Sequence, residues 1–156
     1  MSDLLPTNFV GTAAAAVQSA TTGSCRVYFQ NKDYQIYEMA LSDPTSTTYS
    51  LGNLTSIPFP AGRINTPIAA VSWNNLSEIR VYYITADSQV QEIYYSGGNW
   101  GKPGPVLGAA VETSGFLYAS VVVNTGPVVR VGFQSSTAPQ TITEAVWNGG
   151  WNNRVL

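Results

Sequence analysis

The sequence predicts an all-β fold of three four-stranded propeller blades, which closes as a six-bladed β-propeller when two copies of the chain form a homodimer. Three observations predict it. A β-hairpin pattern recurs three times along the 156 residues, a run of small residues precedes each hairpin, and no long segment shows helical periodicity. The chain is interpreted as a single propeller unit, 1–156, with repeats at about 1–55, 56–110 and 111–156.

The hairpins themselves define the repeat. They are "CRVYFQNKDYQIYEMAL" (25–41), "IRVYYITADSQVQEIYY" (79–95) and "VRVGFQSSTAPQTITEAVW" (129–147). β-Branched and aromatic residues crowd the arms, and turn-forming residues lie at the centre. The period is 54 and 50 residues between arginines and 54 and 52 between glutamates, which are Arg26, Arg80, Arg130, Glu38, Glu92 and Glu144. Such periods suit one propeller blade per repeat.

The remaining strands flank each hairpin. Runs of small residues at 11–19, 66–73 and 116–123 are suited to the crowded inner strand near a propeller axis. Gly- and aromatic-bearing stretches at 47–54, 99–107 and 150–156 are expected to form a short outer strand. Each repeat then contains the four strands of one blade.

Three blades cannot close into a ring, because propellers contain about four to eight. An open stack exposes sheet faces and strand edges, so the chain is expected to assemble with something. A twofold homodimer is the simplest closed solution. A fragment of a longer six-bladed chain is the alternative.

Composition excludes several classes of function. Only 10% of the residues are charged, and a net charge of −2 with a pI near 4.9 argues against a nucleic-acid partner. With no histidine and one cysteine, neither an internal disulfide nor a zinc site can form, and no cofactor is expected. No stretch is long enough to insert into a membrane, and the amino end lacks a basic signal-peptide region. A cytoplasmic or leaderless secreted protein is expected.

The paired charges are the candidate functional groups. In a hairpin centred on Ala86, Arg80 and Glu92 are expected directly opposite one another, on one face of the sheet. An exposed salt bridge of this kind contributes only about 0 to 1 kcal/mol, which is the structural explanation. Three such pairs followed by aromatics favour a binding site instead. Arginine donors and carboxylate acceptors suit adjacent sugar hydroxyls, and aromatic rings suit the apolar face of the sugar.

These motifs resemble a known family. "RVYYITADSQVQEIYYSGGNW", together with "PIAAVSW" and "RVYFQNKDYQIYE", is similar to the fungal fucose-specific lectins of the Aleuria aurantia lectin type. The resemblance implies a six-bladed propeller that binds L-fucose and fucosylated glycans between neighbouring blades. It also implies that one blade supplies Arg and Glu and the next supplies two aromatics.

Carried onto this sequence, the resemblance implies three sites. The first combines Arg26 and Glu38 with Tyr95 and Trp100, and the second combines Arg80 and Glu92 with Trp147 and Trp151. The third combines Arg130 and Glu144 with Leu41 and Tyr49 of a partner chain. A leucine replaces an aromatic in that third site, so it is expected to be weak or inactive. By contrast, Trp73 is expected to be core or wall, and Arg63 and Arg154 to be solvated surface charges.

Two rival functions remain open at this point. A structural or protein-binding propeller would use the Arg and Glu pairs as ties between blades. A sialidase-like glycosidase would need paired carboxylates about 5 to 10 Å apart, and no repeat supplies them. A single carboxylate facing an arginine is also expected to stay ionised, which makes it a poor general acid. The sequence therefore predicts a protein without catalytic activity.

Overall fold

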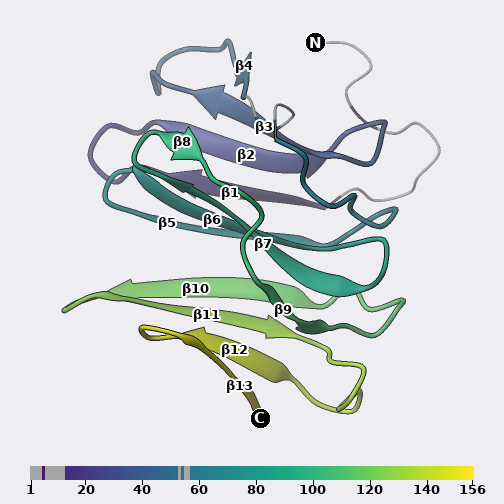
Figure 1. Cartoon of the computed structure of the whole chain (residues 1–156). Helices are drawn as coiled ribbons and strands as arrows, with labels where there is room; N and C mark the ends of the chain where they lie inside the picture. Colours follow the sequence, from purple (N-terminus) through teal and green to yellow (C-terminus); the bar gives the residue numbers. More distant parts are fainter. Residues whose placement is uncertain (1–4, 6–12, 53, 55–56) are drawn as a thin grey trace.

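The computed structural model describes residues 5, 13–52, 54 and 57–156, which form three antiparallel sheets stacked one on another (Figure 1). The first blade contains β1 (Ala14–Gln18), β2 (Cys25–Gln30), β3 (Ile36–Leu41) and β4 (Ser50–Leu51). The second contains β5 (Ile68–Trp73), β6 (Glu78–Ile84), β7 (Gln89–Ser96), β8 (Asn99–Trp100) and β9 (Val106–Ala109). The third contains β10 (Leu117–Val123), β11 (Pro127–Phe133), β12 (Thr143–Trp147) and β13 (Trp151–Val155). The all-β prediction is confirmed.

Within each blade the strands follow chain order from one edge of the sheet to the other. The runs of small residues form the first strand, and the repeated hairpins form the second and third. In the second blade β8 and β9 both pair with β7, so two short strands share the outer position. Residues 11–12 of the first small-residue run lie outside the described residues, as does most of the amino-terminal segment considered for a signal peptide.

The register of the hairpins differs from the prediction by two residues. Each Arg lies opposite the residue two positions after its Glu, and each Glu lies opposite the residue two positions after its Arg. The pairs are Arg26 with Ala40, Glu38 with Tyr28, Arg80 with Tyr94, Glu92 with Tyr82, Arg130 with Val146, and Glu144 with Gly132. Because a shift of two preserves the face, Arg and Glu of each repeat still emerge from the same side of their sheet.

Turn geometry explains this shift. In the second blade the Thr85 amide donates to the Gln89 carbonyl at 2.9 Å, which closes a turn centred on Asp87, one residue later than predicted. Ser88 has a φ of 61°, a left-handed conformation that lets the chain reverse within three residues. The turn therefore moves every cross-strand pair by two positions.

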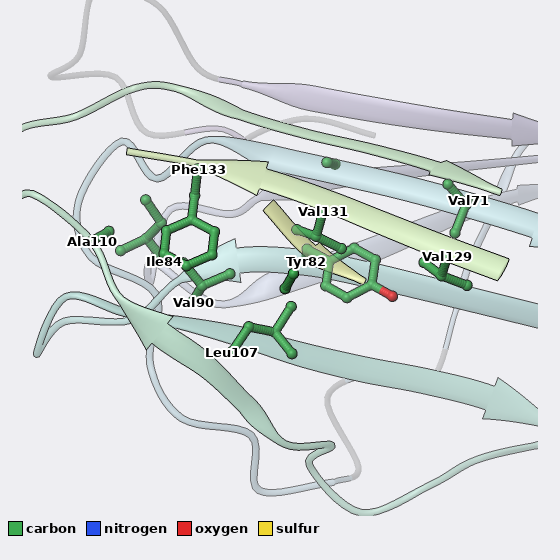
Figure 2. Close-up of a cluster of buried hydrophobic side chains, with 11 residues drawn as sticks. Val71, Tyr82, Ile84, Val90, Leu107, Ala110, Val129, Val131 and Phe133 are labelled. Atoms are coloured by element: carbon green, nitrogen blue, oxygen red, sulfur yellow. The ribbon is translucent and has the colours of Figure 1, made fainter. Parts of the chain in front are cut away.

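Two apolar cores hold the blades together. One fills the space between the first and second blades and includes Tyr28, Val81 and Tyr83, and the other fills the space between the second and third blades. Figure 2 shows the second core, in which Tyr82 of β6 and Phe133 of β11 lie among aliphatic side chains. Because each core is shared by two sheets, the blades stabilise one another.

Alternation along the strands gives each blade two different faces. Arg, Glu and the neighbouring tyrosine of the first and second blades point toward the following blade. The aromatics Tyr95, Trp100, Trp147 and Trp151 point toward the preceding blade, against the same cores. At the ends of the stack, Arg130 and Glu144 face outward from the third blade, and Leu41 faces outward from the first.

Two further findings concern what the described part of the chain contains. It has no helix that is long and apolar enough to cross a membrane. Nor does it contain three or more His, Cys, Asp or Glu side chains grouped to hold a metal ion.

Candidate functional site

A pocket of about 250 Å³ lies between the second and third blades. Arg80 and Glu92 enter it from β6 and β7, and Trp147 and Trp151 enter it from β12 and β13. The structure thus brings together all four residues of the second predicted site. The other lining residues are Trp73, Tyr94, Pro105, Pro127 and Val129.

The carboxylate of this pocket is deeply placed. Glu92 is 6% exposed, and the Tyr82 hydroxyl donates to its Oε2 at 2.8 Å. Gly104, between β8 and β9, covers it: an added Cβ there would lie 2.7 Å from Oε1, so only glycine fits without displacement. Burial raises the pKa of the Glu92 carboxyl, while the Tyr82 hydrogen bond and the Arg80 charge oppose that rise. That Glu92 stays ionised beside Arg80 remains a prediction.

The arginine is held by the backbone. Arg80 Nη1 donates to the carbonyls of Ile79 and Tyr95 at 2.9 and 3.1 Å, and Nη2 forms an ion pair with Glu78 at 3.1 Å. Among the described residues these bonds use three of the five guanidinium donors, which leaves two for a ligand. An ion pair between Arg80 and Glu92 is not formed in this part of the chain, so the cross-strand salt-bridge explanation does not apply here.

The space between the first and second blades repeats this arrangement. The Tyr28 hydroxyl donates to Glu38 Oε2 at 2.8 Å, and burial again raises the pKa of that carboxyl above its ordinary value. Arg26 Nη1 donates to two carbonyls, as Arg80 does. Across the interface, Trp100 meets the Tyr28 ring edge-on at 5.9 Å.

The aromatic pairs match as well. Tyr95 and Trp100 have centroids 5.4 Å apart at an interplanar angle of 59°, and Trp147 and Trp151 have centroids 5.9 Å apart at 58°. In the second interface Trp151 meets Tyr82 edge-on at 6.3 Å, as Trp100 meets Tyr28 in the first. Both predicted combinations within one chain therefore face each other across a blade interface.

The third blade is built differently around Glu144. Arg130 Nη1 and Arg154 Nε each donate to Glu144 Oε2 at 2.9 Å, and the Tyr118 hydroxyl donates to Oε1 at 3.2 Å. Burial raises the pKa of this carboxyl, but the three donors outweigh it and the pKa lies below its ordinary value. Arg154 is exposed to solvent, as expected of a surface charge, but it also forms an ion pair with Glu144. The cross-strand ion pair of the structural explanation is found at Arg130 and Glu144.

The position of Arg154 in the outer strand explains its contact with Glu144. Arg154 lies opposite Glu144 in the outer strand, at the place where the first two blades have Gly52 and Gly104. The carboxylates of Glu38 and Glu92 lie directly against these glycines, whereas position 154 carries an arginine that forms an ion pair with Glu144. Leu41 and Tyr49, predicted for this site, belong to the first blade at the far end of the stack and are not brought to Glu144 within one chain.

Several site residues were missed by the sequence reasoning. Tyr28 and Tyr82 follow the arginines by two residues, so the alternation of the strands was sufficient to place them on the same face. Trp73 was expected to be core or wall, and it lines the pocket wall. Gly52 and Gly104 carried no signal beyond the repeat itself. Arg63, expected to be a solvated charge, instead donates to the carbonyls of Val111, Glu112 and Ser114.

Known proteins share this sequence and fold. Residues 4–155 match the family described as fungal fucose-specific lectin. The fucose-specific lectin of Aleuria aurantia is 29% identical over 158 residues, covering 94% of this chain and 49% of that protein. That of Aspergillus oryzae is 31% identical over 142 residues, covering 90% of this chain and 43% of that protein. The chain thus spans about half the length of these curated relatives.

The solved structures agree on the fold. The Aleuria aurantia lectin, described as a six-bladed β-propeller, matches 96% of this chain and 50% of its own with a TM-score of 0.75 and 29% identity. A fucose lectin from Kordia zhangzhouensis matches with a TM-score of 0.66 and 18% identity, over 92% of this chain and 97% of its own. The three sheets are therefore propeller blades, and the chain belongs to the fungal fucose-specific lectin family.

Proposed function

We propose that this protein is a lectin that binds L-fucose and fucosylated glycans in the pockets between its blades. The observation that carries the proposal is the pocket in which Arg80 and Glu92 of one blade face Trp147 and Trp151 of the next. Membership of the family supports it, since the relatives' own names describe them as fucose-specific.

The chemistry of the pocket suits a deoxy sugar. Glu92 offers its remaining acceptor positions to hydroxyl groups, and Arg80 offers its two remaining donors. The rings of Trp147 and Trp151 provide an apolar wall for the C–H groups and the methyl group of the sugar. These residues have no second carboxylate among them, so the pocket supports binding rather than glycoside hydrolysis.

Two sites of this kind per chain are proposed, and the third repeat is proposed to be inactive. Glu144 already accepts hydrogen bonds from Arg130, Arg154 and Tyr118, so a sugar hydroxyl would have to displace one of them. These three hydrogen bonds to Glu144, in addition to Leu41, are the reason to expect a weak third site.

A homodimer is proposed to complete the ring. The chain supplies three blades, and the relatives with which it aligns over about half their length include a six-bladed propeller. Light scattering of the purified chain is expected to give about twice its 16.7 kDa. A monomer at all concentrations would contradict the dimer.

Titration calorimetry with L-fucose, with galactose as control, tests the function. The expected result is a fucose-specific isotherm with about two sites per chain, reduced to about one site by Arg26→Ala or by Arg80→Ala. Glu112→Gln, which changes an exposed side chain away from the pockets, is the matched control and retains two sites. No heat at millimolar sugar from the folded protein would favour a structural or protein-binding propeller.

A further inference from the structure

The two blade interfaces hold their arginines differently. The guanidinium carbon of Arg80 lies 4.8 Å from the ring centroid of Trp73 and 5.3 Å from that of Tyr94. Trp73 belongs to β5 and Tyr94 to β7, on the two sides of β6, so the guanidinium is flanked by rings on both sides. Both distances are within the range of cation–π attraction.

Tyr94 is itself fixed by its surroundings. A Cβ at Gly101 would overlap the Tyr94 ring, so the backbone after β8 lies directly on that ring. The Gly101 amide also donates to the Tyr94 carbonyl at 2.9 Å. The ring that flanks Arg80 therefore has little freedom to turn away.

Glu78 adds a third constraint. Its Oε2 accepts from Arg80 Nη2 at 3.1 Å, and its Oε1 accepts from the Ser96 hydroxyl at 2.6 Å. The Ser96 hydrogen bond therefore fixes the Glu78 carboxylate independently of its ion pair with Arg80. The side chains of Arg80 and Glu78 are 19% and 21% exposed, so this ion pair is only partly screened by solvent.

The first blade lacks all three constraints. Val17 lies opposite Arg26 as Val71 lies opposite Arg80, which places Ser19 where the second blade has Trp73. By the same correspondence Ala40 stands in place of Tyr94, and Ser24 in place of Glu78. Arg26 keeps the backbone anchors, at 2.9 and 3.3 Å, but has neither rings nor a carboxylate at these positions.

We infer that Trp73, Tyr94 and Glu78 are positioning residues that hold Arg80 in its binding orientation before the sugar arrives, so that the two sites of the chain differ in affinity. The inference rests on the proposed function. Ordering a long, rotamer-rich side chain on binding opposes association. Where the ordering is already done, the site binds more tightly, by roughly two- to tenfold. The tighter site lies between the second and third blades.

Single-site variants test the inference. Arg26→Ala isolates the site between the second and third blades, and Arg80→Ala isolates the other. Calorimetry with L-fucose is expected to give the lower Kd for Arg26→Ala, by roughly two- to tenfold. Equal affinities would overturn the inference while leaving the lectin function intact, whereas no binding by either variant or by the unmodified protein would overturn the function itself.

Substitutions of Trp73 distinguish a role in positioning Arg80 from direct contact with the sugar. In the Arg26→Ala background, Trp73→Ser copies the first blade and is expected to raise the Kd by several-fold, roughly to that of the other site. Trp73→Phe keeps an aromatic face and is expected to retain most of the affinity. Loss of affinity in both variants alike would show that Trp73 acts through indole-specific contact with the sugar, and would overturn the positioning role.

A ligand-free measurement keeps the inference testable if a variant fails to fold. In the NMR spectrum of the unmodified protein without sugar, ring currents of Trp73 and Tyr94 are expected to shift the side-chain protons of Arg80 away from their ordinary positions. Arg26, with Ser19 and Ala40 beside it, is expected to give ordinary shifts. Ordinary shifts at both arginines would show that Arg80 is not held before binding.

Discussion

Tyr118 lies directly opposite Gly132 across β10 and β11, and its ring fills the space that a side chain at position 132 would need. In the second blade the matching pair is Ala69 opposite Tyr82, so the large and small residues have exchanged strands. In both blades a tyrosine hydroxyl reaches the glutamate of the same sheet. The third blade therefore keeps the hydrogen bond between tyrosine and glutamate, but its tyrosine comes from the first strand, β10, instead of the second.

This exchange predicts strong coupling between the two positions. Tyr118→Ala removes the donor to Glu144, and Gly132→Tyr places a Cβ against the Tyr118 ring, so each single variant is expected to lose stability. The double variant recreates the arrangement of the second blade and is expected to recover about 1 to 3 kcal/mol relative to the sum of the single changes. Urea unfolding of all four proteins measures the coupling, and strict additivity would contradict it.

Gly104→Ala is expected to disable the pocket between the second and third blades. The added Cβ would lie 2.7 Å from Glu92 Oε1, so the carboxylate must shift and the free energy of unfolding should fall by about 1 to 3 kcal/mol. Calorimetry should show one fucose site per chain in place of two. Gly126→Ala meets nothing within 4 Å and serves as the control, which should retain both sites and full stability.

Tyr82→Phe is expected to move the pH dependence of sugar binding. The Tyr82 hydrogen bond lowers the pKa of the Glu92 carboxyl, so its removal raises that pKa further above the ordinary value. If binding requires the ionised carboxylate, affinity is then lost at a higher pH as the solution is acidified. Calorimetry in the Arg26→Ala background, between about pH 4 and 8, measures the pH at which half of the affinity for the sugar is lost. Tyr83→Phe, whose hydroxyl bonds the Pro60 carbonyl, should leave it unchanged.

Glu144→Gln is expected to reduce stability at neutral pH and not at low pH. The pKa of Glu144 is lowered in the folded protein, so its ionised form stabilises the fold above the ordinary value of 4.5, and this contribution is lost as the pH falls below it. Solvent-facing arginines cover the carboxylate, with exposed fractions of 38% and 55%, so the loss is expected to be about 1 to 2 kcal/mol.

Urea unfolding at about pH 7 and about pH 3 tests whether the stability contributed by Glu144 falls as the pH falls. The difference between the unmodified protein and Glu144→Gln should shrink at the lower pH. A difference of the same size at both values would mean that the carboxylate charge contributes nothing, and that only the geometry of the amide matters.

Thr143→Val is expected to be neutral or stabilising. Thr143 is 5% exposed, and its hydroxyl has no hydrogen-bond partner within the part of the chain that the structure describes. Thr66 is the opposite case, because its hydroxyl donates to the Ile84 carbonyl at 2.9 Å and accepts from the Ile84 amide at 2.8 Å. Thr66→Val should therefore cost about 1 to 3 kcal/mol. Thermal unfolding of both variants makes the comparison, and an equal loss in both would contradict the assignment.

The repeat, and the face from which its charged side chains emerge, could be predicted from the spacing of Arg and Glu. Arg and Glu recur at a nearly constant spacing, and strand alternation fixes the face from which they emerge whatever the register. The same alternation places Trp147 on the opposite face from Arg130, toward the preceding blade. Spacing and alternation therefore predicted the face of each side chain, and the resemblance to the lectin family predicted which side chains meet across a blade interface.

What the sequence reasoning did not reach depends on single turns and single contacts. The register follows from the left-handed conformation of Ser88, a residue with no strong preference for it. The different environment of Glu144 follows from Arg154 standing at a position held by glycine in the other blades, which becomes visible only when the outer strands are paired. The flanking of Arg80 by Trp73 requires a third strand, beyond the hairpin on which the motif was defined.

Each blade has a head, with Arg, Glu and a tyrosine hydroxyl, and a tail of aromatic and aliphatic side chains. All blades are stacked in the same orientation, so one end of the stack is a head and the other end is a tail. In a ring of two copies, each head meets the other copy's tail, which makes two equivalent seams from one pair of unlike surfaces. Mixing a head-damaged copy with a tail-damaged copy would then repair one seam and concentrate both defects in the other. A mixed dimer formed by subunit exchange would therefore have one intact interface and one interface that carries both defects.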